Sequence, residues 1–145
     1  MRCWNENLQS VWTFDRVLPA IPYRQWVLSL PFGLRRLLAN NGDLCTAVLG
    51  VFIRKVFAWL KRKARRLGVK DPSPGAVLAI QRANAALQSC LHFHAFVTDG
   101  VFDPAPGEAG GVAFRAVDPP TDRELARLVR LIARRIGRTL VRLGY

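Results

Sequence analysis

The spacing of apolar residues along the chain separates its predicted strands from its predicted helices. Residues 24–31 alternate apolar and polar side chains and end at a proline, which is typical of a strand. Residues 32–42 predict a short helix closed by Asn-Asn-Gly. A long helix is expected from Asp43, as its N-cap, to about Leu67, with Gly68 as its C-terminal stop. The buried stripe of this helix is expected to contain Leu44, Val48, Phe52, Val56, Trp59 and Leu60.

The second half of the chain predicts more strands and one further helix. Residues 76–81 form a short apolar run, expected to be a buried strand that pairs antiparallel with residues 91–97. Asp99-Gly100 turns the chain, and a Pro/Gly-rich hairpin or arm should follow over residues 101–117. Thr121 and Glu124 form a capping box that opens the last helix. Its apolar stripe is expected to contain Leu125, Leu128, Val129, Ile132, Ile136 and Leu140.

This order of elements predicts an α+β fold. Strands with short connections favour an antiparallel sheet, and the two long amphipathic helices should pack on one face of it. The sequence contains no internal repeat, Walker loop or GxGxxG motif. With 145 residues, half of them hydrophobic, the chain is long enough to bury a core of its own.

The strong positive charge points to a polyanionic partner. The net charge is +12, and arginine supplies 18 of the 22 basic residues. Because the planar guanidinium suits phosphate, nucleic acid is the first expectation, although solvated helix faces would give the same composition. The candidate DNA-binding side chains lie on the two long helices and are Arg54, Lys61, Arg65, Arg127, Arg130, Arg134 and Arg138.

The cysteines and the hydropathy indicate a cytoplasmic protein. Cys3, Cys45 and Cys90 are odd in number and far apart, so no disulfide framework or zinc ribbon is expected. Residues 1–10 are polar and contain no apolar core of a signal peptide. The most apolar window, residues 44–60, is interrupted by two basic residues and is too short to span a bilayer, so no membrane partner is expected.

The chain has two histidines, and they lie one residue apart in the apolar segment CLHFHAFVTDGVF. On a strand, His92 and His94 point to the same face about 6.6 Å apart, because each residue rises about 3.3 Å. Phe93 then points the other way, into the core. Two imidazoles so close can chelate one divalent cation, and Gln81 on the neighbouring strand is the candidate third ligand. Partly exposed strand histidines without a ligand remain an alternative.

Cys90 shares the predicted face of the two histidines and offers another possibility. A structural zinc site could use Cys90, His92 and His94, although the sequence shows no clear fourth ligand. The imidazoles should also need hydrogen-bond acceptors behind them, and the sequence does not identify these.

Three segments together resemble the rolling-circle transposases of bacterial insertion sequences, which carry the His–hydrophobic–His (HUH) motif. They are VLPAIPYRQWVLSLPFGLRRLLA, LCTAVLGVFIRKVFAWLKRKARRLG and AVLAIQRANAALQSCLHFHAFVTDGVF. The resemblance extends from about Val17 to the C-terminus, so residues 1–16 are expected to be an irregular segment and residues 17–145 part of a catalytic domain. It implies a ferredoxin-like nuclease core that binds single-stranded DNA and takes no small-molecule substrate.

The same resemblance implies a metal-dependent cut by a tyrosine. His92 and His94 match the histidines that hold Mg²⁺ or Mn²⁺ against the scissile phosphate, and Gln81 is assigned by position only. The family's catalytic tyrosine lies on a helix well downstream of this motif, and neither Tyr23 nor Tyr145 matches it. The cysteine-rich segment that usually begins such proteins is also not seen, so a fragment shortened at both ends and inactive alone is expected. A basic nucleic-acid-binding module without catalysis and the zinc module are the alternatives.

Overall fold

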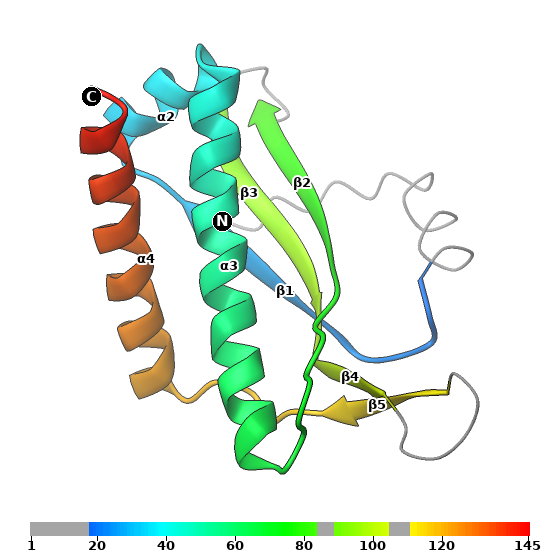
Figure 1. The fold of residues 1–145 in the computed structure, drawn as a ribbon. Coiled ribbons are helices and arrows are strands. Elements are labelled where there is room, and N and C mark those ends of the chain that lie inside the picture. Colours follow the sequence, from blue (N-terminus) through cyan, green and yellow to red (C-terminus); the bar gives the residue numbers. More distant parts are fainter. Residues whose placement is uncertain (1–17, 84–88, 105–110) are drawn as a thin grey trace.

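The protein contains three helices and five strands within the part of the chain that the structure describes. The structure is a computed structural model, and it describes residues 18–83, 89–104 and 111–145 (Figure 1). The elements are β1 (Tyr23–Ser29), α2 (Phe32–Ala39), α3 (Gly42–Arg66), β2 (Ala76–Ala83), β3 (Ser89–Thr98), β4 (Gly100–Pro104), β5 (Val112–Ala116) and α4 (Asp122–Arg142). Each predicted strand and helix is therefore confirmed, whereas the predicted segment 1–16 lies outside the described residues.

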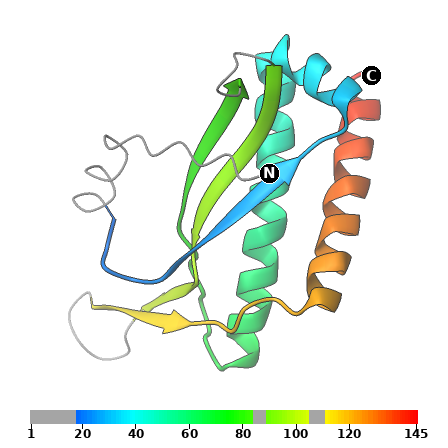
Figure 2. The same ribbon diagram turned by 180° about the vertical axis from the view of Figure 1, so that it is seen from behind.

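The sheet has three antiparallel strands in the order β1-β3-β2, so the histidine-bearing strand β3 lies in its centre. Strands β4 and β5 form a separate two-stranded hairpin. Figures 1 and 2 show α3 running across one face of the sheet, with α4 alongside α3. The predicted α+β fold with an antiparallel sheet and two long helices that pack together is confirmed.

The predicted apolar stripe of α3 is buried throughout. Trp59 is 2% exposed, and its ring contacts Trp26 of β1 edge-on at 5.7 Å between centroids. Because α3 packs on the sheet through this stripe, the side chains of β3 that face it, such as Phe93, are fully buried. The six predicted stripe residues belong to the core, as do Cys45, Val51 and Ala64.

The start of α3 corrects one prediction. The N-cap is Asn41 and not Asp43, because the Asn41 side chain accepts a hydrogen bond from the backbone N–H of Leu44 at 2.9 Å. Asp43 lies instead in the first turn, where its charge still favours the positive end of the helix dipole.

The end of α3 follows the prediction. Gly68 adopts φ +88°, the left-handed conformation that glycine tolerates best. Its N–H donates to the carbonyl of Arg65, and the N–H of Val69 donates to that of Ala64, which together form a Schellman motif.

Two predictions of burial were wrong. Strand β2 is an edge strand, not a buried one, and Val77, Leu78 and Ile80 are 37–41% exposed. In the stripe of α4, Leu125 and Val129 are exposed, whereas the other predicted members are at least half-buried and Thr139 is buried as well. Both errors have the same cause: an apolar side chain is buried only where a neighbouring element covers it, and no described element covers these positions fully.

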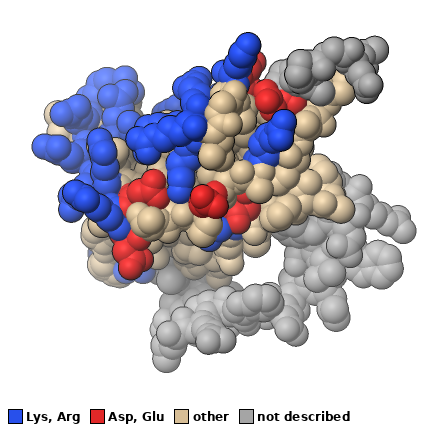
Figure 3. All heavy atoms as spheres, turned by 90° about the horizontal axis from the view of Figure 1, so that it is seen from below, with Lys and Arg blue, Asp and Glu red and all other residues tan. Residues whose placement is uncertain are grey.

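Basic side chains are not evenly spread over the surface. Figure 3 views the molecule from the end where α3 finishes and α4 begins. Lys and Arg gather over the helices at this end, whereas the described surface nearer the sheet and hairpin carries few charges. The strongest positive surface in this view therefore belongs to the helix layer.

Candidate metal site and nucleic-acid interface

Strand β3 separates the two histidines from the core by simple alternation. Leu91, Phe93 and Ala95 are fully buried beneath the helices, whereas His92 and His94 are partly exposed on the other face of the sheet. The prediction that Phe93 packs inward while the histidines share the opposite face is confirmed.

The two imidazoles lie side by side on this face. Their ring centroids are 4.7 Å apart and the ring planes are tilted by 58°. In the β2–β3 register, Gln81 lies directly opposite His92. The predicted pairing of these strands required the two residues to be neighbours. The structure thus places the three predicted ligand residues next to one another on two neighbouring strands.

A residue that the sequence did not reveal contacts the pair from the other side. Gln25 of β1 forms a hydrogen bond of 2.8 Å between its Nε2 and Nδ1 of His94. In this orientation of the amide, its nitrogen donates and Nδ1 accepts, which requires the imidazole proton on Nε2. That Nε2 is enclosed and has no hydrogen-bond partner within the described structure. If the Gln25 amide rotated by a half-turn, its Oε1 would accept a hydrogen bond from Nδ1–H of His94. Nε2 would then carry a lone pair that could bind a cation.

The surroundings of His94 favour its neutral form. Burial lowers the pKa of His94, and the positive charge that His92 would carry lowers it further. Metals bind the neutral imidazole, so this shift reduces the competition between a proton and a cation at Nε2.

The donor atoms of the three predicted ligands decide which cations they suit. Two imidazole nitrogens and an amide oxygen suit Mn²⁺ or a related ion with water in the remaining positions. In the described parts of the chain, no cluster of three or more His, Cys, Asp and Glu side chains could hold a metal. The Cys90 side chain, and with it the predicted zinc alternative, lies outside what the structure describes.

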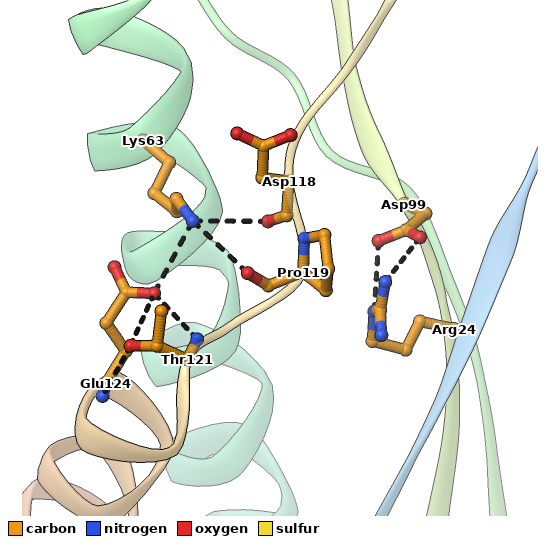
Figure 4. Close-up of polar contacts among 7 residues, drawn as sticks. All are labelled: Arg24, Lys63, Asp99, Asp118, Pro119, Thr121 and Glu124. Carbon is orange, nitrogen blue, oxygen red and sulfur yellow. Dashed lines mark hydrogen bonds and ion pairs between the residues drawn. The ribbon is translucent and has the colours of Figure 1, made fainter.

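An ion pair between Arg24 and Asp99 links the start of β1 to the residue that follows β3. Arg24 donates from Nε and Nη2 to the two carboxylate oxygens of Asp99, at 3.0 and 2.6 Å (Figure 4). This two-pronged geometry is the strongest that an arginine and a carboxylate adopt. Since Arg24 is opposite Val97 in the register, the pair helps to hold β1 on the strand that carries the histidines.

Neither tyrosine lies beside the histidines. Tyr23 pairs with Thr98, four residues from His94 along β3, which corresponds to about 13 Å. Its hydroxyl donates to the carbonyl of Pro19. Tyr145 accepts a hydrogen bond from Asn41 at the start of α3. The structure thus gives neither hydroxyl a contact with the histidine pair.

Two of the seven predicted DNA-binding side chains line a groove between the two long helices. Between α3 and α4 lies a groove of about 430 Å³, and Arg127 and Arg130 line it. The basic residues of α3 that line the groove are Lys55, Arg62 and Arg66, and each follows a predicted residue by one position. The predicted residues that do not line the groove are Arg54, Lys61, Arg65, Arg134 and Arg138.

Fold and site together define a class of protein: an α+β domain with a histidine pair on the sheet face opposite the helices and a basic helix layer behind it. Comparison with known proteins adds no closer assignment, because no family model, curated protein or solved structure matches the chain. None of the described helices is both long and apolar enough to cross a membrane.

Proposed function

We propose that this protein is the metal-binding core of a transposase of the rolling-circle, HUH-motif class, which binds single-stranded DNA and a divalent cation. The observation that carries the proposal is the histidine pair on the sheet face opposite the helices. Its rings are 4.7 Å apart, and Gln81 lies opposite His92. The net charge of +12 is consistent with a nucleic-acid partner.

The arrangement of elements supports a ferredoxin-like core within this proposal. Apart from the β4–β5 hairpin and the short α2, the described elements follow the order β-α-β-β-α. The third strand lies between the first two, as expected where a helix connects β1 to β2 and β3 follows β2 as its antiparallel partner.

Each residue of the site has a distinct role in this proposal. His92, His94 and Gln81 hold the cation, and Gln25 orients the His94 ring through Nδ1. The bound cation, Mg²⁺ or Mn²⁺, supplies Lewis-acid polarisation of a phosphoryl oxygen. The three ligands are neutral, so the full charge of a bound cation would remain available to a phosphate placed beside it.

Within the described residues, neither tyrosine is placed as a nucleophile beside the histidine pair. Tyr23 and Tyr145 are the two tyrosines of the sequence, and neither contacts the histidines. We therefore expect the purified 145-residue chain to bind single-stranded DNA without nicking it. A metal-dependent nick by this chain would contradict that expectation.

Calorimetric titration with Mn²⁺ tests the metal site. The wild type should bind one Mn²⁺ per chain, and the His92→Ala/His94→Ala variant should release no binding heat. Ser29→Ala is a matched control, because Ser29 lies opposite His92 on β1 and is exposed. Equal heats from the wild type and the double variant would contradict the proposal.

The net charge favours a second candidate, a basic nucleic-acid-binding module without chemistry. Such a module would bind DNA with a steep salt dependence and would be indifferent to Mn²⁺ and to the histidine substitutions. Metal analysis of protein purified without added zinc separates both proposals from the zinc alternative, which requires one zinc ion per chain.

A further inference from the structure

The groove between α3 and α4 concentrates more positive charge than any single helix face predicts. Six basic side chains line it, three from each helix, together with one carboxylate, Glu124. Trp59 and Leu128, both buried, line it as well. The basic residues are Lys55, Arg62 and Arg66 of α3 and Arg123, Arg127 and Arg130 of α4.

Helical spacing sets these side chains in two rows. On α3 the basic positions are separated by seven and four residues, and on α4 by four and three, so each set lies on one face of its helix. With a rise of about 1.5 Å per residue, the rows are about 16 and 10 Å long. Rows of this length can contact several successive phosphates of one strand.

The single carboxylate does not neutralise the groove. Glu124 is already bound by Lys63, whose Nζ lies 3.4 Å from Oε2 and also donates to the carbonyls of Asp118 and Pro119 (Figure 4). The same oxygen accepts the backbone N–H of Thr121 at 3.0 Å. Glu124 is therefore committed to anchoring the start of α4 on α3.

The six basic side chains have no such partners. Among the described residues, the ion pairs are Arg24–Asp99 and Lys63–Glu124, and neither includes a basic residue of the groove. Five of the six are exposed, and Lys55 is half-buried. Unpaired charges of one sign repel one another across a groove, so an anion bound there would relieve a cost that the free protein bears.

We propose that this groove is a second nucleic-acid-binding site, which holds the phosphate backbone of a DNA strand. Arginine supplies five of its six basic side chains, and the guanidinium fork matches phosphate oxygens in a two-pronged contact. A concave groove between two helices fits a linear polyanion better than the flat surface of a membrane. The groove alone indicates that a polyanion binds there. The choice of DNA as that polyanion rests on the function proposed above.

The site is separate from the histidine face. The histidines point away from the helices, as the burial of Phe93 between them shows, whereas the groove lies within the helix layer. One chain can therefore hold DNA on two sides of the sheet at once. The groove would retain a flanking segment of the strand whose other part reaches the metal site.

Fluorescence anisotropy with a labelled single-stranded 20-mer, in EDTA to exclude metal, tests the groove. The variant Arg62→Gln/Arg127→Gln/Arg130→Gln should bind at least about 10-fold more weakly at low salt. The slope of log K against log salt should fall by about 2, since each lost phosphate contact removes about 0.7. The matched control, Arg115→Gln/Arg135→Gln/Arg142→Gln, removes three exposed arginines outside the groove and should cost less than about 3-fold.

Three results would overturn the proposal: equal losses in both triple variants, no loss in the groove variant, or polyglutamate that competes as well as an oligonucleotide of equal charge. If the triple variant does not fold, judged by circular dichroism, Arg62→Gln and Arg130→Gln are compared singly with Arg135→Gln. Mn²⁺ calorimetry on the same proteins separates the two sites. A failed groove leaves metal binding intact, and a failed metal site leaves the groove result unchanged.

Discussion

At the scale of single residues, Gln25 decides which nitrogen of His94 would face a cation in the proposed metal site. Its side chain faces Nδ1 at 2.8 Å, and the free Nε2 is the enclosed atom that has no other partner. To bind a metal through Nε2, His94 needs a lone pair on that nitrogen, so its proton must lie on Nδ1. The Nδ1–H group then needs a hydrogen-bond acceptor. The amide of Gln25 supplies that acceptor by a half-turn, without movement of the backbone.

This role makes a prediction for two substitutions. Gln25→Leu removes the acceptor at similar volume and should weaken Mn²⁺ binding by about 10- to 100-fold, the usual effect of losing such a partner. Gln25→Glu supplies a permanent acceptor and should bind at least as tightly as the wild type. Calorimetry measures both affinities, and nitrogen NMR of His94 should show the tautomer change. If the Gln25→Leu variant bound Mn²⁺ as tightly as the wild type, Gln25 would have no role in the metal site.

The pattern of residues predicted His92, His94 and Gln81 but not Gln25. The two histidines and the glutamine follow from alternation along β3 and from the β2–β3 pairing, which are local in the sequence. Gln25 is 69 residues from His94 and becomes its neighbour only because β1 is the other partner of β3. A strand pattern alone does not show which of two distant strands will lie alongside, so this contact needed the structure.

At the scale of elements, the beginning of α4 depends on the ionised form of Glu124. The backbone N–H of Thr121 donates to its carboxylate and lowers the pKa of Glu124, and Lys63 acts in the same direction, whereas burial opposes them. Since the pKa is lower in the folded protein than the usual value of about 4.3, the stabilisation is complete above that pH. It is lost as the pH falls through the lowered pKa.

The variant Glu124→Gln should therefore cost stability in a pH-dependent way. At pH 7 we expect a loss of about 1 kcal/mol in the free energy of unfolding, as for other helix caps. The difference from the wild type should shrink towards pH 3, and urea unfolding at pH 7, 5 and 3 measures it. Asp122→Asn removes the same charge from the same first turn and should give a smaller, flatter difference. A pH-independent loss in Glu124→Gln would refute this account of the capping box.

The errors at the element scale share a physical origin. The segment Asn40-Asn41-Gly42-Asp43 contains three side chains that can cap a helix, those of its two asparagines and its aspartate. The backbone angles of Asn41 (φ −139°, ψ 99°) identify it as the N-cap. In β2, a continuous apolar run predicts burial on both faces, as in a central strand. That inference fails for Leu78 and Ile80 because β3 occupies the centre of the sheet and β2 its edge.

At the scale of the whole molecule, the sequence located the basic helices but not the surface they form together. A helical wheel shows that Arg54, Lys61 and Arg65 share a face, but not which face of α3 meets α4. The packing of the two helices brings the neighbouring positions Lys55, Arg62 and Arg66 into the groove instead. A surface built from two helices depends on their relative rotation, which a pattern within one helix does not contain.

The separation of the groove from the histidine face leads to a final prediction about stability. A ligand that binds only the folded state stabilises it by about 2.7 kcal/mol at 100 times its dissociation constant. For a chain of this size, that corresponds to a rise of about 5 to 10 °C in Tm. Mn²⁺ at such a concentration should raise the Tm of the wild type and of the groove variant equally, and should not raise that of His92→Ala/His94→Ala. Differential scanning calorimetry measures the shift. A groove variant that loses the Mn²⁺ effect would mean that the two sites are coupled, because only ligands at uncoupled sites stabilise a fold independently.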